Sequence, residues 1–96
     1  MSPINKKKLN LLRVKLDKLD NTLLKIIKKR SNLVNEVLKV KIHKKEIIDQ
    51  KRINFILKKI KKKSIQLNID PKITNRIWKN IIWSFIDYEK RNFKKK

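Results

Sequence analysis

The sequence predicts an all-α fold, a three-helix chain with one long N-terminal helix, which associates as a homodimer. Apolar residues recur at steps of three and four, which is the spacing of one helix face, and no alternating strand pattern occurs. The chain of 96 residues is short enough for one hydrophobic core. We therefore expect a single helical domain over residues 1–96.

The first predicted helix, residues 9–42, carries a heptad-like stripe in alternating steps of three and four. The stripe consists of Leu9, Leu12, Leu16, Leu19, Leu23, Ile26, Arg30, Leu33, Val37 and Val40. At ~1.5 Å per residue such a helix is roughly 50 Å long. A three-helix monomer of this size cannot cover so long a stripe, so the pattern predicts a second chain against it.

Two shorter helices follow a short linker over residues 43–48. Asp49 has the character of an N-cap and predicts a helix through about Gln66. The pair Asp70-Pro71, an N-cap followed by proline at the first helical position, predicts a third helix to about Asn92. The expected apolar positions are Ile53, Ile56, Leu57 and Ile60 in the second helix, and Ile73, Ile77, Trp78, Ile81, Ile82 and Phe85 in the third.

The formal charge of +21 invites a nucleic-acid interpretation. Lys, Ile and Asn make up more than half of the chain, whereas Gly and Ala are absent. An A/T-biased genome produces this composition without selection for nucleic-acid binding, so we expect no specific nucleic-acid partner. A basic helical nucleic-acid-binding protein stays open as an alternative of another class.

Other features limit the chemistry and the location. The chain has no cysteine and one histidine, so we expect no metal and no thiol chemistry. No apolar run approaches the ~18–20 residues of a membrane span, and the first residues lack the apolar core of a secretory signal. We expect a cytoplasmic protein with no membrane partner.

Three polar residues interrupt the apolar faces. Arg30 lies within the stripe of the first helix, Lys41 lies on nearly the same face three turns later, and Glu89 continues the apolar line of the third helix. Lys41 and Glu89 also have a structural explanation, because a long side chain can snorkel to water and a helix end can leave the core. Arg30 lies in mid-helix and needs an anionic partner, and acids are scarce. The interruption at Arg30 therefore predicts a negatively charged ligand.

Arg13 and Arg52 extend this prediction. The chain has five arginines against 24 lysines. An arginine in so lysine-rich a chain suggests a need for planar, bidentate contacts to carboxylates. Two such side chains suit a small dicarboxylate.

Three segments carry a resemblance to a known family. They are "LRVKLDKLDNTLLKIIKKRSNLVNEVLKVK" (12–41), "IIDQKR" (47–52) and "LNIDPKITNRIWKNIIWSFIDYE" (67–89). Their order and spacing resemble the all-helical chorismate mutases. The resemblance implies an intertwined homodimer with shared active sites. It also implies an isomerase that rearranges chorismate to prephenate in phenylalanine and tyrosine biosynthesis, without a cofactor.

The resemblance implies catalytic roles for Arg30, Lys41 and Glu89, each of which would also bind substrate. Arg30 would hold a substrate carboxylate from inside the bundle. Lys41 would contact the ether oxygen and a carboxylate. Glu89 occupies the position where many relatives have a glutamine on the ether oxygen. The substrate would then be the counter-ion of Arg30.

The remaining expected substrate-binding residues are Arg13, Asp49, Arg52 and Phe85. By resemblance, Arg13 would come from the other subunit, and Asp49 and Arg52 would lie near the ring hydroxyl. Two positions depart from the pattern, because Ile53 replaces a common glutamate and Phe85 replaces a common serine. Isochorismate-pyruvate lyases, a branch of the same fold, also tend to be apolar there, so that reaction stays an alternative.

Overall fold

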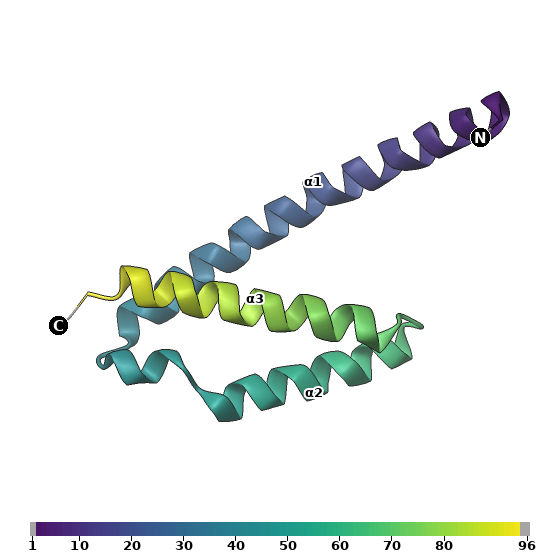
Figure 1. Cartoon of the computed structure of the whole chain (residues 1–96). Helices are drawn as coiled ribbons and strands as arrows, with labels where there is room; N and C mark the ends of the chain where they lie inside the picture. The colour runs from purple at the N-terminus through teal and green to yellow at the C-terminus, as the bar shows by residue number, and fades with distance from the viewer. Residues whose placement is uncertain (1, 95–96) are drawn as a thin grey trace. The chain divides into compact units, whose positions relative to one another are not determined.

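The structure is a computed structural model that describes residues 2–94. It contains α1 (Pro3–Val40), the short 3₁₀ helix η1 (Lys44–Ile47), α2 (Gln50–Gln66) and α3 (Pro71–Asn92) (Figure 1). Within the described residues there is no β-strand. The all-α prediction and the order long, short, medium helix are confirmed.

The starts of α2 and α3 are those that the sequence predicts. The Asp49 side chain accepts a hydrogen bond from the Arg52 backbone N–H at 3.0 Å, and the Asp70 side chain accepts one from the Lys72 N–H at 2.9 Å. Each carboxylate satisfies a donor that the first helical turn leaves unpaired. Pro71 occupies the first helical turn of α3, where its missing N–H costs nothing.

The first helix differs from its predicted bounds at both ends. It begins at Pro3 rather than residue 9, because Ser2 and Pro3 form the same cap-and-proline signal as Asp70-Pro71. The Ser2 hydroxyl accepts the Asn5 N–H at 3.2 Å. The helix ends at Val40, and the predicted linker contains η1.

The turn between α2 and α3 depends on Asn68. This residue has a φ of 57°, the left-handed conformation that asparagine tolerates better than most residues. The turn lets Ile69 N–H donate to the Ser64 carbonyl at 2.8 Å. The buried Ser64 and Thr74 hydroxyls then bond each other at 2.6 Å, which ties the two helices together beside the turn.

The chain divides between Leu33 and Val34 into two structural units. The first unit is helical and consists of most of α1, and no residue of α1 is buried. Its exposed apolar residues include much of the predicted stripe: Leu12, Leu16, Leu19, Leu23, Ile26 and Leu33. The predicted stripe is therefore present as an uncovered apolar face of α1.

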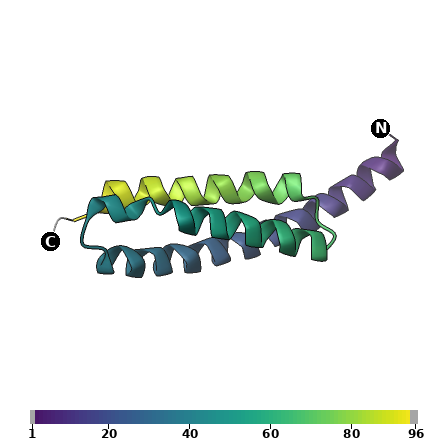
Figure 2. The same ribbon diagram turned by 90° about the horizontal axis from the view of Figure 1, so that it is seen from below.

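The second unit holds the core. In it α2 and α3 lie side by side, joined by the turn at residues 67–70, as the two views agree (Figures 1 and 2). The buried apolar residues are Ile47, Ile53, Ile82 and Ile86, with Ile56, Leu57 and Phe93 packed against them. On α3, Ile82 is buried as expected and Ile86 is buried as well, whereas Ile73 and Ile77 at its start are exposed in the single chain.

Candidate functional site

Lys41 and Glu89, both in the second unit, contact each other through their side chains. Lys41 directly follows the end of α1, and Glu89 lies near the end of α3. The Lys41 Nζ donates to Glu89 Oε1 at 3.0 Å. The two side chains are 17% and 8% exposed. The structure thus brings together two of the three polar residues that interrupt the apolar pattern.

This ion pair explains how both charges are tolerated at low exposure. A charge that leaves water needs an opposite charge or hydrogen bonds nearby. Lys41 and Glu89 supply this to each other within the chain. Removal of either partner would leave a poorly hydrated charge, so the pair is sensitive to single substitutions.

An open cavity of about 440 Å³ lies beside Lys41. Its lining residues come from the segment after α1, from η1, from the junction with α2 and from the first turn of α2: Lys41, Glu46, Ile48, Asp49, Gln50 and Lys51. Two of the predicted substrate-binding residues, Lys41 and Asp49, therefore share one cavity.

The other predicted residues of the second unit are Arg52 and Phe85. Arg52 lies in the first turn of α2, and its guanidinium carbon lies 5.4 Å from the centre of the exposed Phe55 ring, a cation–π distance. Phe85 is partly buried on α3, one helical turn before Glu89. Ile53, where relatives often have glutamate, is 7% exposed and belongs to the core.

Arg13 and Arg30 belong to the first unit. Arg13 is exposed, and Arg30 is partly buried. Both lie on α1.

The predicted pattern missed Glu46. Its carboxylate Oε1 accepts the His43 N–H at 2.8 Å and the Ile42 N–H at 3.3 Å. The hydrogen bond from His43 lowers the pKa of Glu46 below its ordinary value, although partial desolvation acts in the opposite direction. Glu46 lies three residues after His43, the N-cap of η1. A glutamate at this position is half of a capping box, and that spacing is the signal by which the sequence could have revealed Glu46.

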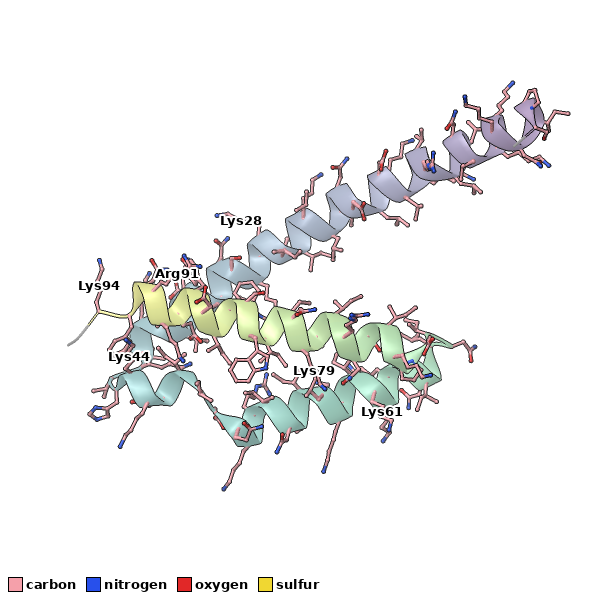
Figure 3. All side chains as sticks on the ribbon, in the orientation of Figure 1. Lys28, Lys44, Lys61, Lys79, Arg91 and Lys94 are labelled. Carbon is pink, nitrogen blue, oxygen red and sulfur yellow. The ribbon has the colours of Figure 1, made fainter. Side chains whose placement is uncertain are left out.

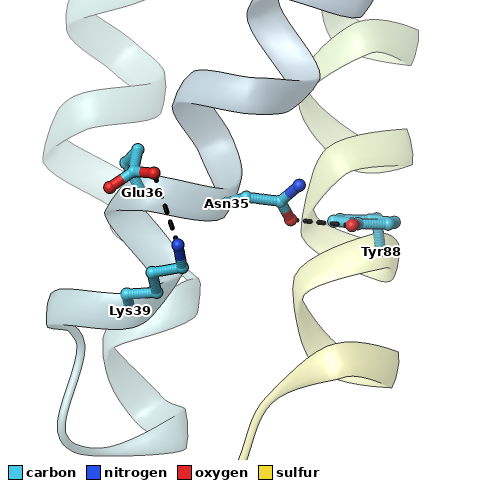
Figure 4. Close-up of polar contacts among 4 residues, drawn as sticks. All are labelled: Asn35, Glu36, Lys39 and Tyr88. Atoms are coloured by element: carbon cyan, nitrogen blue, oxygen red, sulfur yellow. Dashed lines mark hydrogen bonds and ion pairs between the residues drawn. The ribbon is translucent and has the colours of Figure 1, made fainter.

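Two further contacts hold the end of α1 (Figure 4). The Tyr88 hydroxyl donates to Asn35 Oδ1 at 2.7 Å, which links α3 to α1. On the exposed surface, Lys39 Nζ lies 3.4 Å from Glu36 Oε1. The Tyr88–Asn35 bond helps to fix the helix turn that precedes Lys41.

Within residues 2–94, no group of three or more His, Asp or Glu side chains is arranged to hold a metal ion. None of the described helices is both long and apolar enough to cross a bilayer.

Comparison with known families identifies the fold. Residues 12–90 match the family model described as chorismate mutase type II. The chain belongs to this family. No curated protein and no solved structure matches it. The match includes every residue to which the resemblance assigned a role, from Arg13 to Glu89. As a chorismate mutase type II family member, the chain has the all-helical architecture that its periodicity predicts.

Proposed function

We propose that this chain is a chorismate mutase that rearranges chorismate to prephenate for phenylalanine and tyrosine biosynthesis. The observation that supports this most directly is the Lys41–Glu89 contact. These residues are 48 positions apart in the chain and form a hydrogen bond of 3.0 Å. They occupy the two positions that the family resemblance assigns to the substrate's ether oxygen.

The proposed reaction breaks one C–O bond and forms one C–C bond within a single molecule. It needs neither a nucleophile nor a transferred proton, so the protein acts by positioning and electrostatics. Negative charge grows on the ether oxygen as the C–O bond lengthens. The Lys41 ammonium would stabilise that charge. The Glu89 carboxyl, which pairs with Lys41 in the free chain, would donate a second hydrogen bond only in its protonated form.

The arginines would hold the dianionic substrate in its reactive shape. Arg30 would hold one carboxylate, and Arg52 and Asp49 would lie near the ring hydroxyl. A guanidinium makes two parallel hydrogen bonds to a carboxylate, which a lysine cannot do. Phe85 would pack against the substrate where relatives have a serine.

We propose an intertwined homodimer in which the partner subunit's Arg13 completes each site. The exposed stripe of α1 supports this, since Leu16, Leu19 and Leu23 are each 51–64% exposed in the single chain. An apolar face of this length favours a second helix against it. Sedimentation at micromolar concentration should give about twice the chain mass. A monomer that still turns over chorismate would exclude the shared site.

One assay separates the mutase from its nearest alternative. Loss of chorismate is followed by absorbance, isochorismate is supplied in a parallel reaction, and prephenate and salicylate are identified as products. We expect prephenate from chorismate, and Lys41→Ala prepared identically should lose most of the activity. Salicylate and pyruvate from isochorismate, with no prephenate, would assign the lyase reaction instead. Ile53 and Phe85, both apolar at positions that are often polar in mutases, are the reason to test it.

The basic charge gives a separate expectation. Labelled cations occur on all three helices and on η1, among them Lys28, Lys44, Lys61 and Lys79, and their side chains extend away from the ribbon (Figure 3). We expect DNA and RNA binding at low salt that is independent of sequence and largely lost at physiological salt. Sequence-selective, salt-tolerant binding would contradict the proposed function. A cytoplasmic location stays a prediction.

A further inference from the structure

The end of α1 leaves Lys41 outside the regular helix. The helix ends at Val40, and the Lys41 N–H donates to the Leu38 carbonyl at 3.3 Å, three residues back. Residues beyond a helix end are not fixed by the repeating i to i−4 hydrogen bonds. The direction of the Lys41 side chain therefore depends on the backbone that follows it.

Glu46 fixes that backbone. Its carboxylate accepts the N–H groups of Ile42 and His43, the first two residues after Lys41. In return, the Glu46 N–H donates to the His43 carbonyl at 3.0 Å. Hydrogen bonds to an ionised carboxylate are stronger than those between neutral groups, and the lowered pKa of Glu46 keeps it ionised near neutral pH.

The next residue anchors the loop to the core. Ile47 is 3% exposed and packs in the cluster with Ile53, Ile82 and Ile86. Both sides of Glu46 are thus restrained, because its carboxylate holds the end of α1 and its neighbour is buried against α2 and α3. The Lys41 ammonium then meets Glu89 on α3 at 3.0 Å.

We propose that Glu46 is a positioning residue, which orients Lys41 for catalysis by holding the backbone of Ile42 and His43. The inference rests on the proposed function, in which Lys41 acts on the ether oxygen. Glu46 makes its hydrogen bonds to backbone rather than to Lys41 Nζ, so it acts through the loop. A displacement of about 1 Å in a catalytic group can lower a rate by about a hundredfold, so a modest loop shift has a measurable effect.

Glu46 also lines the cavity with Lys41 and Asp49, so a direct substrate contact is the competing role. The two roles predict different kinetics. Removal of a contacting Glu46 would change KM: KM would fall if Glu46 repels a substrate carboxylate, and it would rise if Glu46 accepts a hydrogen bond from a substrate hydroxyl. Removal of a positioning Glu46 would lower kcat and leave KM nearly unchanged, because Lys41 is misplaced mainly for the transition state.

The test compares Glu46→Ala, Glu46→Gln and the matched control Glu36→Ala. Glu36 is an acid of the same charge near the end of α1, and its carboxylate contacts the exposed Lys39. We expect Glu46→Ala to lower kcat about tenfold or more, Glu46→Gln to retain an intermediate kcat through its amide oxygen, and Glu36→Ala to behave as the wild type. Wild-type kcat in Glu46→Ala, with KM unchanged, raised or lowered, would overturn the proposal.

A double-substitution cycle tests whether Glu46 acts through Lys41. In the Lys41→Ala background, Glu46→Ala should cause little further loss, because the residue it positions is gone. An equal loss in both backgrounds would show a general effect on the fold and overturn the proposal.

Nuclear magnetic resonance gives a readout that does not depend on turnover. In Glu46→Ala, the Ile42 and His43 amides should exchange with solvent faster, and the Lys41 ¹⁵Nζ signal should move towards those of the exposed lysines. Unchanged exchange and an unchanged Lys41 signal would overturn the positioning role. If the wild-type chain is inert towards chorismate, the proposed function fails, and these spectra alone still decide whether Glu46 holds Lys41.

Discussion

The two units of the chain use the same kind of residue in opposite ways. The second unit buries isoleucines from η1, α2 and α3 in a small core, whereas α1 buries none of its residues. Leu19 is 64% exposed and Ile47 is 3% exposed. The second unit therefore has a small apolar core of its own, and the first unit carries an exposed apolar face.

The polar residues differ in the same way. In the second unit, Lys41 pairs with Glu89, and Tyr88 bonds Asn35. The first unit contributes Arg13 and Arg30, which the proposed mechanism joins to the site through substrate and through a second subunit. The second unit thus has a core and polar contacts within the chain, whereas the proposed role of the first unit depends on the proposed dimer.

The largest effect should come from charges on the apolar stripe. Leu19→Glu combined with Leu23→Glu should give a monomer at micromolar concentration, because two unpaired carboxylates would have to enter the interface. Activity should fall by about a thousandfold or more if the site is shared, since a penalty of several kcal/mol acts on assembly. Sedimentation and the chorismate assay measure the two effects.

The matched control for the stripe is Asn21→Glu. Asn21 is exposed on the opposite face of the same helix turn, and its substitution adds one negative charge, against two in the Leu19 and Leu23 variant. It should stay dimeric and active. A fully active monomer from the Leu19 and Leu23 variant would remove the distinction between the two units.

Arg30→Ala should have the next largest effect. Loss of its carboxylate contact should remove about 3 kcal/mol of transition-state stabilisation, which is about a hundredfold in kcat/KM. Arg30→Lys should recover little, because an ammonium cannot make the planar pair of hydrogen bonds. The exposed Arg76 of α3 supplies the control Arg76→Ala, which should retain activity. A folded, fully active Arg30→Ala would refute the role of Arg30 in substrate binding.

Glu89 tests the chemistry of the second unit. An ionised carboxylate cannot donate a hydrogen bond to the ether oxygen, whereas a protonated one can. A glutamine amide, in contrast, donates at every pH. Glu89→Gln should keep a hydrogen-bond donor at every pH. Its kcat/KM should therefore depend less on pH than that of the wild type and exceed it several-fold at the alkaline end. The measurement is kcat/KM from about pH 4.5 to 9 for both proteins.

Two superimposable profiles would show that Glu89 is not the donor. The Lys41–Glu89 pair would then have a structural role, in which each charge serves to satisfy the other. Circular dichroism of Glu89→Gln under the same conditions separates a change in protonation from a loss of fold.

The sequence predicted the helices well because their signals are local. Asp49 and Asp70-Pro71 mark helix starts through single hydrogen bonds to the first turn. The early start at Pro3 was missed although Ser2 gives the same signal, because the apolar stripe begins only at Leu9. The 3₁₀ helix η1 was missed because His43 is an unusual first member of a capping box.

The candidate site was harder to predict from the residues alone. Lys41 and Glu89 each have an ordinary explanation, as a snorkelling side chain and as a helix end. Their contact joins α3 to the end of α1, and no local pattern encodes a pairing over that separation. Only the family resemblance connected them. The pairing within the chain adds that Glu89 already has a cationic partner before substrate binds.

The smallest expected effect concerns Glu46 and stability in acid. The His43 N–H, and secondarily the Ile42 N–H, hold the pKa of Glu46 below its ordinary value of 4.5 in the folded chain, against partial desolvation. A carboxyl group whose pKa is lowered by folding stabilises the fold above its unfolded pKa. That contribution is lost as pH falls through the lower, folded pKa.

Unfolding midpoints of the wild type should therefore decline below about pH 4.5, partly because this loop loses its ionised acceptor. Glu46→Gln cannot titrate, so its midpoint should be slightly lower than the wild type at neutral pH and should converge with it in acid. Glu36→Gln removes the same charge from an exposed surface pair and isolates the part that belongs to the loop. A constant difference between wild type and Glu46→Gln across this range would mean that the carboxylate contributes by shape alone. The end of α1 would then be held chiefly by the burial of Ile47.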